Sequence, residues 1–298
     1  MAQIREIKKR MVAVRTIQRI TKTMQMIATA KFTAALHRAK ATRPYTERIR
    51  ALVAEVSADA GDVSSPLLGK HSGHHSRADA GKPSREVLLV VASDRGLCGA
   101  YNGSVLRAAM AEIRKRRALG HELVMETAGK KAAAFFRYQR AEVAQKHSFG
   151  DKPSFEAVAA LADRYMADFV AGKIDAVHVA YMRFVSNSRQ TPEIMQLLPL
   201  ALEGTRETKK PSATVYEFRP NAEAILNDLL PRSVRVSLFQ AMNDAVVSEN
   251  VMRMVAMKAA TDNAGSLGRT LKRNYNRARQ AKITTELTEI VSGAAALE

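Results

Sequence analysis

The first 57 residues carry apolar side chains at the spacing of a long helix that pairs with another helix. Their apolar stripe consists of Ile4, Ile7, Met11, Val14, Ile17, Ile20, Met24 and Ile27. Intervals of three and four residues are typical of a coiled-coil seam, and the three-residue slip after Val14 predicts local overwinding. Pro44 is expected to kink the helix near Arg43.

Residues 58–84 contain Gly, Ser, Pro and His without any apolar period, which indicates a flexible loop. His71, His74 and His75 form a pattern that can bind metal. No cysteine or carboxylate set completes such a site, so we predict an exposed loop and no metal.

Residues 85–200 have a different pattern, in which short β-rich apolar runs alternate with helical segments. The helical pattern covers residues 104–117, 130–139 and about 154–172, and Ser154 is a candidate helix cap. Such alternation predicts a Rossmann-like α/β domain with a parallel, doubly wound sheet. The expected strands are 87–93, 122–127, 142–147, 175–184 and 193–200.

The helical period returns after a connector over residues 201–232, which holds a short helix at 223–230. Gly265 and Gly268 interrupt this second long helix, which runs from 233 to 298. They indicate either a local break or the close approach of a partner helix. We expect the two terminal helices to form an antiparallel two-helix coiled coil, since each stripe needs a partner. The second stripe consists of Leu238, Met242, Ala245, Met252, Ala256 and Ala259, followed by Ile283, Leu287, Ile290, Ala294 and Leu297.

The net charge of +18 indicates an anionic partner, although a solvated basic surface is the open alternative. Cys98 is the only cysteine, so no intramolecular disulfide can form. No apolar run is long enough to span a membrane. The basic N-terminus lacks the features of a cleavable leader, and we read it as mature protein.

No motif predicts catalysis or a cofactor. The turn SDRGLCGAYNGS (93–104) follows a strand, but its glycines do not have dinucleotide-loop spacing. His121, His147 and His178 have no carboxylate partner at a recognisable spacing, and we expect them to be structural. Two rival readings stay open at this point, namely a nucleic-acid-binding coiled coil and an enzyme built on residues 85–200.

Four motifs in the same order resemble the gamma subunit of F-type ATP synthases. They are IREIKKRMVAVRTIQRITKTMQMIATAKF (4–32), SDRGLCGAYN (93–102), ATDNAGSL (260–267) with YNRARQAKIT (275–284), and ITTELTEIVSGAAA (283–296). The resemblance covers nearly the whole chain, and only the His-rich segment around 62–80 looks longer than the family minimum.

The resemblance implies a central rotor stalk that couples proton flow to the catalytic cycle without being catalytic itself. The implied partners are the alpha and beta subunits of the catalytic hexamer, the epsilon subunit and the membrane c-ring, with no nucleic acid. The implied location is peripheral, on the cytoplasmic face of a bacterial plasma membrane. Implied rotor contacts are Met24, Arg253, Gln280, Thr284, Glu286, Glu289, Ala294 and Leu297.

The resemblance also gives a function to the small, nearly uncharged end of the chain. Gln280 and Thr284 are expected to make specific contacts, whereas the alanines from Ala294 to Ala296 are expected to turn against a collar of the hexamer. Small apolar side chains would slide there without forming ion pairs that must break at each step.

Overall fold

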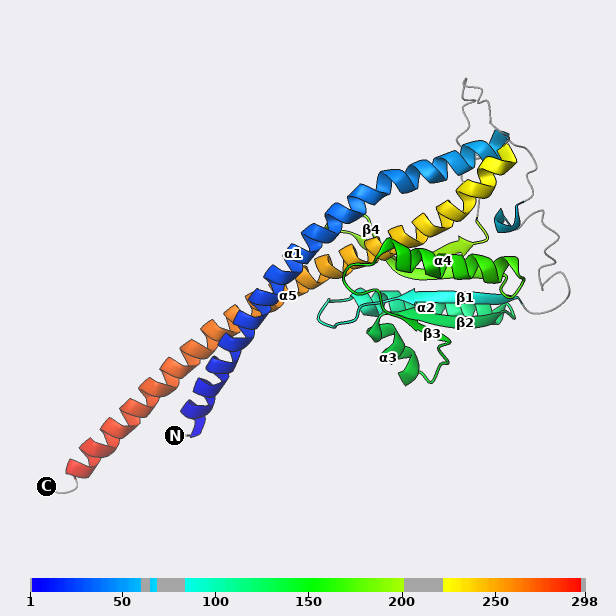
Figure 1. The fold of residues 1–298 in the computed structure, drawn as a ribbon. Coiled ribbons are helices and arrows are strands. Elements are labelled where there is room, and N and C mark those ends of the chain that lie inside the picture. The colour runs from blue at the N-terminus through cyan, green and yellow to red at the C-terminus, as the bar shows by residue number, and fades with distance from the viewer. Residues whose placement is uncertain (1, 60–64, 69–83, 201–221, 296–298) are drawn as a thin grey trace. The chain divides into compact units, whose positions relative to one another are not determined.

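The computed structural model describes residues 2–59, 65–68, 84–200 and 222–295. His71, His74 and His75 lie outside these ranges, as do Ala296 and Leu297. Two compact units make up the chain, one of residues 31–252 and the other of the two ends, 1–30 and 253–298. The long helices α1 (Ala2–Asp59) and α5 (Ala222–Ala295) each contribute to both units (Figure 1).

The unit of residues 31–252 is built on a five-stranded sheet with the order β3-β2-β1-β4-β5. Its strands are β1 (Arg85–Val91), β2 (Glu122–Ala128), β3 (Gln145–His147), β4 (Ala176–Phe184) and β5 (Gln190–Leu198). The first four strands run parallel. β1 is buried along nearly its whole length, as its continuous apolar sequence predicted.

The last strand departs from the predicted all-parallel sheet, because β5 pairs antiparallel with β4. Residues 185–189 join the two strands in a hairpin, in which Arg189 N donates to Ser186 O. A parallel crossover needs a dozen or more residues, so this short connection allows only the antiparallel arrangement.

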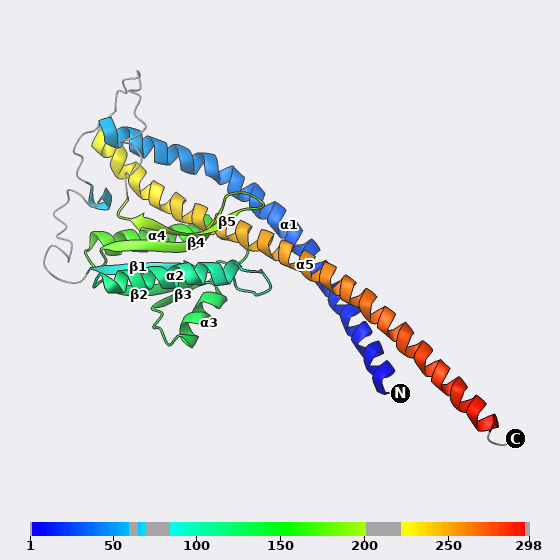
Figure 2. The ribbon, with the colours of Figure 1, turned by 180° about the vertical axis from the view of Figure 1, so that it is seen from behind.

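Helices cover both faces of the sheet, as a doubly wound fold requires (Figures 1 and 2). On one face, α2 (Tyr101–Ala118) and α3 (Lys130–Tyr138) enclose a core with Leu88 and Val90. On the other, α4 (Phe155–Val170) packs with parts of α1 and α5 against Leu89 and Val91. The Ser154 hydroxyl caps α4 by accepting from Ala157 N at 3.2 Å, which confirms that prediction.

The C-terminal helix begins earlier than the pattern predicted. We expected a separate short helix before residue 233, but α5 is continuous from Ala222 and passes through Pro231. Proline costs this helix one backbone hydrogen bond. Burial of one face offsets that cost, because four side chains at four-residue intervals are fully enclosed. They are Leu226, Leu230, Val234 and Leu238.

Of the two alternatives left open for Gly265 and Gly268, a local break is absent, since both glycines lie within α5. α1 likewise continues through Pro44. Long paired terminal helices beside a Rossmann-like sheet confirm the predicted fold class, apart from the direction of β5.

Candidate functional site

The unit of the two chain ends is an antiparallel helix pair whose pairing can be read residue by residue. Thr261 Oγ1 donates to Thr21 Oγ1 at 2.8 Å. A Cβ added to Gly265 would lie 2.9 Å from Gln18 Nε2, and one added to Gly268 would lie 3.8 Å from Val14. Because positions fall along α1 as they rise along α5, the helices run antiparallel. Of the two readings of these glycines, the close approach of a partner helix is therefore the right one.

The inward side of α1 differs from the predicted stripe after Val14. The seam continues without a slip through Gln18, Thr21, Gln25 and Ala28, whereas Ile17, Ile20 and Ile27 are 51–52% exposed. The predicted three-residue slip is therefore wrong. The α5 residues that face this part of α1 are small, so polar side chains fit between the two helices. Thr21 bonds to Thr261 there, and Gln18 lies against Gly265.

The seam of α5 keeps a regular alternation of three and four residues. It passes through Met257, Thr261, Ala264, Gly268, Leu271, Tyr275, Ala278 and Lys282. Earlier along α5, the predicted positions Leu238, Met242 and Ala245 are buried in the sheet-bearing unit. Ala259 is exposed, so it does not belong to the seam.

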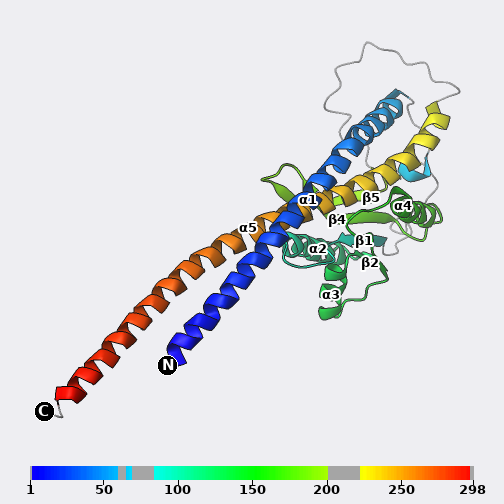
Figure 3. The same cartoon turned by 60° about the vertical axis from the view of Figure 1, so that its left-hand side comes forward.

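Beyond about Gln280, no helix of the described residues lies beside α5. The antiparallel pairing places Ala2, the first described residue of α1, opposite about Gln280. The views agree that α5 extends past the start of α1 (Figures 1 and 3). We predicted that Ile283, Leu287 and Ile290 would lie in the seam, but they are exposed, as is Val291. We call these four residues, 283, 287, 290 and 291, the apolar tip stripe.

The polar side of the same segment is largely satisfied within the helix. Thr284 Oγ1 donates to Gln280 O at 3.1 Å, and Thr285 and Thr288 bond back to earlier carbonyls in the same way. Glu286 forms an ion pair with Lys282 at 3.1 Å. These polar groups therefore have partners within the helix, whereas the apolar side chains of the same segment are exposed to solvent.

The predicted contact residues occupy two levels of this helix pair. Met24 and Arg253 are half-buried at one level, and Arg253 also has a partner within the structure. Gln280 and Thr284 are exposed at the other level, which the helical rise places roughly 40 Å away. Glu286, Glu289 and Ala294 are exposed beyond them. The structure thus does not gather the predicted residues into one site.

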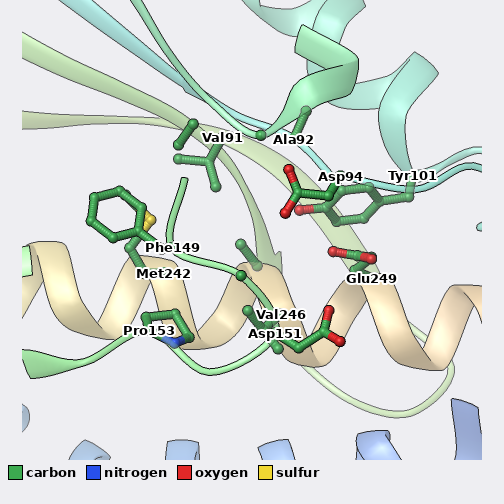
Figure 4. A pocket seen from close by; sticks show the side chains of 14 residues that line it. Val91, Ala92, Asp94, Tyr101, Phe149, Asp151, Pro153, Met242, Val246 and Glu249 are labelled. Atoms are coloured by element: carbon green, nitrogen blue, oxygen red, sulfur yellow. The ribbon is translucent and has the colours of Figure 1, made fainter. Parts of the chain in front are cut away.

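A pocket lies at the carboxyl ends of β1 and β2, where doubly wound folds usually bind ligands. Asp94, Asp151 and Glu249 gather at its Tyr101 end, and Phe149 lies toward the other end (Figure 4). Lys31 and Arg38 bind Asp151 from α1. A lining with three carboxylates disfavours nucleotide phosphates, which counts against the rival reading of a nucleotide enzyme.

The three histidines of the sheet have carboxylate partners that sequence spacing did not reveal. His121 and His178 each lie 3.3 Å from Glu86, and His147 Nε2 lies 2.7 Å from Glu126 Oε2. These contacts join neighbouring strands, so the partners are far apart in sequence. Both carboxylates are buried and also bind an arginine. The clusters therefore brace the sheet.

Electrostatics keep both carboxylates charged despite their burial. Burial alone would raise the pKa of Glu126, but hydrogen bonds from His147, Arg164 and Tyr165 lower it to about 2. The pKa of Glu86 is also lowered, because His178 and Arg116 outweigh its burial. No group of metal-ligating side chains occurs among the described residues.

Known proteins place this arrangement of helices and sheet in a family. A model of the ATP synthase family matches residues 3–297. The ATP synthase gamma chain of Rhodopirellula baltica is 40% identical over the whole of both chains. The chain belongs to the ATP synthase gamma chain family. The gamma chain of Saccharopolyspora erythraea is 36% identical, with the alignment covering 100% of this chain and 98% of that one.

Solved structures share the fold of this gamma chain at lower identity. A chain in the Euglena gracilis mitochondrial ATP synthase, in an assembly with OSCP, F1 and the c-ring, aligns with a TM-score of 0.66 and 19% identity. That alignment covers 99% of this chain and 95% of the Euglena chain. A chain of the Tetrahymena thermophila central stalk and c-ring aligns with a TM-score of 0.57 and 22% identity, over 81% of this chain and 99% of that one. At these identities the likeness supports the fold alone.

Proposed function

We propose that this gamma chain is the central rotor shaft of an ATP synthase and that it couples proton flow to the conformational cycle of the catalytic subunits. The exposed apolar tip stripe carries the proposal. Leu287 and Ile290 are 57% and 68% exposed on the last segment of α5, which has no neighbour within the described chain. An apolar stripe of this kind marks a surface that a partner covers.

The chemistry of the helix pair fits a shaft that touches several copies of one partner. Ile17, Ile20 and Ile27 add apolar surface to one side of α1, while cationic residues occupy other positions. Such a shaft is asymmetric around its axis. It therefore makes different contacts with each of several equivalent subunits, and differential contact is what shifts a conformational equilibrium.

The proposed partners are the alpha and beta subunits around the shaft, and the epsilon subunit and c-ring at the sheet-bearing unit. Solved structures of similar fold support this choice, because the Euglena assembly contains F1 and the c-ring and the Tetrahymena assembly contains the c-ring. The proposed location is peripheral, at the cytoplasmic face of a bacterial inner membrane. No described helix has the length and apolar character needed to cross a membrane.

We also propose that the chain is not catalytic and needs no cofactor. The pocket at the strand ends carries carboxylates where a nucleotide would need cations. Each histidine of the sheet lies beside a buried carboxylate that connects neighbouring strands, which supports a structural role for all three. ATP chemistry would then occur on the catalytic partners.

Co-purification tests this function through the apolar tip stripe. Covering the exposed half of Leu287 and of Ile290 stabilises the complex by about 1 kcal/mol each. Replacing both with serine should therefore weaken assembly with alpha and beta subunits roughly 30-fold. Val170 and Leu119 are comparably exposed on other helices and loops, so their serine double variant is the matched control. Equal assembly of all three chains would contradict the shaft assignment.

Coupling is tested separately at Met24 and at the alanines of the tip. Met24→Lys adds a charge that acidic loops of the hexamer could bind in only some rotor positions. We expect this variant to lower ATP-driven proton pumping relative to ATP hydrolysis. Bulky or charged substitutions of Ala294 and its neighbours should slow rotation-coupled turnover. Unchanged pumping and turnover would remove Met24 and the alanines, respectively, from the proposed contact surface.

A further inference from the structure

The helices α2 and α3, which cover one face of the sheet, have a strongly cationic outer surface. Every exposed position of α2 and α3 holds Lys, Arg, Ala or Tyr138. The only acid of these two helices, Glu112, is held by Arg116 at 2.6 Å. The exposed positions of α4, on the opposite face, hold no cation. We call the outer surface of α2 and α3 the cationic face, and its main cations are Arg107, Arg114, Lys115, Arg117, Lys131 and Arg137.

Four cations of this face have no ion-pair partner within the described chain. Among the described residues, no carboxylate forms an ion pair with Arg114, Lys115, Lys131 or Arg137. The nearest exposed acid in sequence, Glu122, binds Arg85 instead at 3.6 Å. Repulsion among uncompensated like charges destabilises a folded unit, so their concentration on one face indicates an anionic ligand outside the chain.

The surface chemistry favours a bilayer as that ligand. Specific protein interfaces are centred on large apolar anchors, and the exposed positions between the cations of this face hold alanines and one tyrosine. Nucleic-acid surfaces for single strands use several aromatic platforms, whereas Tyr138, which is 84% exposed, is the single aromatic here. Tyrosine among lysines and arginines suits the headgroup level of a membrane.

We propose that the cationic face binds the anionic headgroups of a phospholipid bilayer. This deepens the proposed function, since it assumes that the chain works beside a membrane. Fixed ion pairs with a stationary protein would have to break as a rotor turns. Mobile lipid headgroups exchange freely, so they attract the face without holding it at one angle.

The test is vesicle co-sedimentation of the full-length chain. Wild type should bind vesicles of phosphatidylcholine mixed with phosphatidylglycerol and not vesicles of phosphatidylcholine alone. The face variant replaces Arg114, Lys115, Lys131 and Arg137 with glutamine, and it should lose at least about 100-fold of the binding to anionic vesicles. Circular dichroism of each variant verifies the fold.

A matched variant separates the face from net charge. It replaces Arg5, Lys8, Arg15 and Lys22, which are exposed on α1, with glutamine, so the net charge is the same. This variant should keep most of the anionic-vesicle binding. Equal losses in both variants, or no loss in the face variant, would overturn the proposal.

Two further measurements complete the test. If duplex DNA binding falls with the face variant while vesicle binding stays unchanged, the ligand is nucleic acid and the proposal is wrong. Assembly of the face variant with alpha and beta subunits is measured separately and should equal that of wild type. A chain that fails to assemble in either form would contradict the shaft function, not the headgroup site.

Discussion

The buried carboxylate of Glu126 gives the sharpest test of how the sheet-bearing unit is held together. Its Oε2 atom lies 2.7 Å from His147 Nε2 and accepts hydrogen bonds from Arg164 at 2.6 Å and Tyr165 at 2.8 Å. These three partners come from β3 and α4. One carboxylate on β2 therefore joins the edge strand β3 to the covering helix α4. Glu126→Gln should weaken the contacts of β2 with both elements.

The size of the effect follows from the pKa of Glu126. Burial would raise this pKa, but the three hydrogen bonds lower it from 4.5 to about 2. At neutral pH this difference corresponds to about 3 kcal/mol of folding stability. Because the folded-state pKa is depressed, the stabilisation is full above about pH 4.5 and is lost as the pH falls toward 2. At pH 3 less than half of it, about 1.4 kcal/mol, remains.

Urea unfolding of the full-length chain, followed by circular dichroism, measures this effect at pH 7 and pH 3. The stability difference between wild type and Glu126→Gln should be about 3 kcal/mol at pH 7 and should shrink by about half at pH 3.

Glu193→Gln is the control for this experiment, because Glu193 binds Arg183 at 3.2 Å in a partly exposed pair. It should cost less than about 1 kcal/mol. A Glu126 effect that matches the control, or one that is the same at both pH values, would refute the reasoning.

Three further substitutions test local geometry by thermal or urea unfolding. Gly129→Ala should cost at least about 3 kcal/mol, because φ is +99° there and a Cβ would lie 2.1 Å from the Ala92 carbonyl oxygen. Gly265→Ala should change stability by less than about 1 kcal/mol, since the flexible Gln18 side chain can move and alanine favours the helix. Ser154→Ala should cost about 1 kcal/mol through loss of the α4 cap, and a neutral result would exclude that cap as a stabilising contact.

Much of the fold was predictable because it depends on local period and on connection length. The alternation of strands and helices predicted the doubly wound region, and Ser154 was recognisable as a cap. The antiparallel β5 was missed, although the short segment between the last two predicted strands already contained the signal. A crossover helix cannot fit between them, so connection length should have decided the direction.

The candidate site was less accessible to sequence reasoning. Burial of Ile17 and burial of Gln18 are almost equally compatible with one helix, since the two positions are neighbours. In the structure, Thr21 bonds to Thr261 and Gln18 lies against Gly265. These contacts between the two helices place Gln18 and Thr21, rather than Ile17 and Ile20, on the side of α1 that faces α5. The carboxylate partners of the histidines were invisible for a similar reason, because their contacts cross between strands that lie far apart in sequence.

The sequence by itself determined that two long helical ends flank an α/β region, because helical and strand periods are properties of consecutive residues. Its four motifs also determined the family. Only the tertiary structure decided which side of each long helix faces its partner and at which residue the pairing of the two helices ends. The described part of α1 begins opposite about Gln280, and Leu287 and Ile290, which lie beyond that point on α5, are exposed rather than paired. That outcome depends on the register between two distant segments, and no local pattern records it.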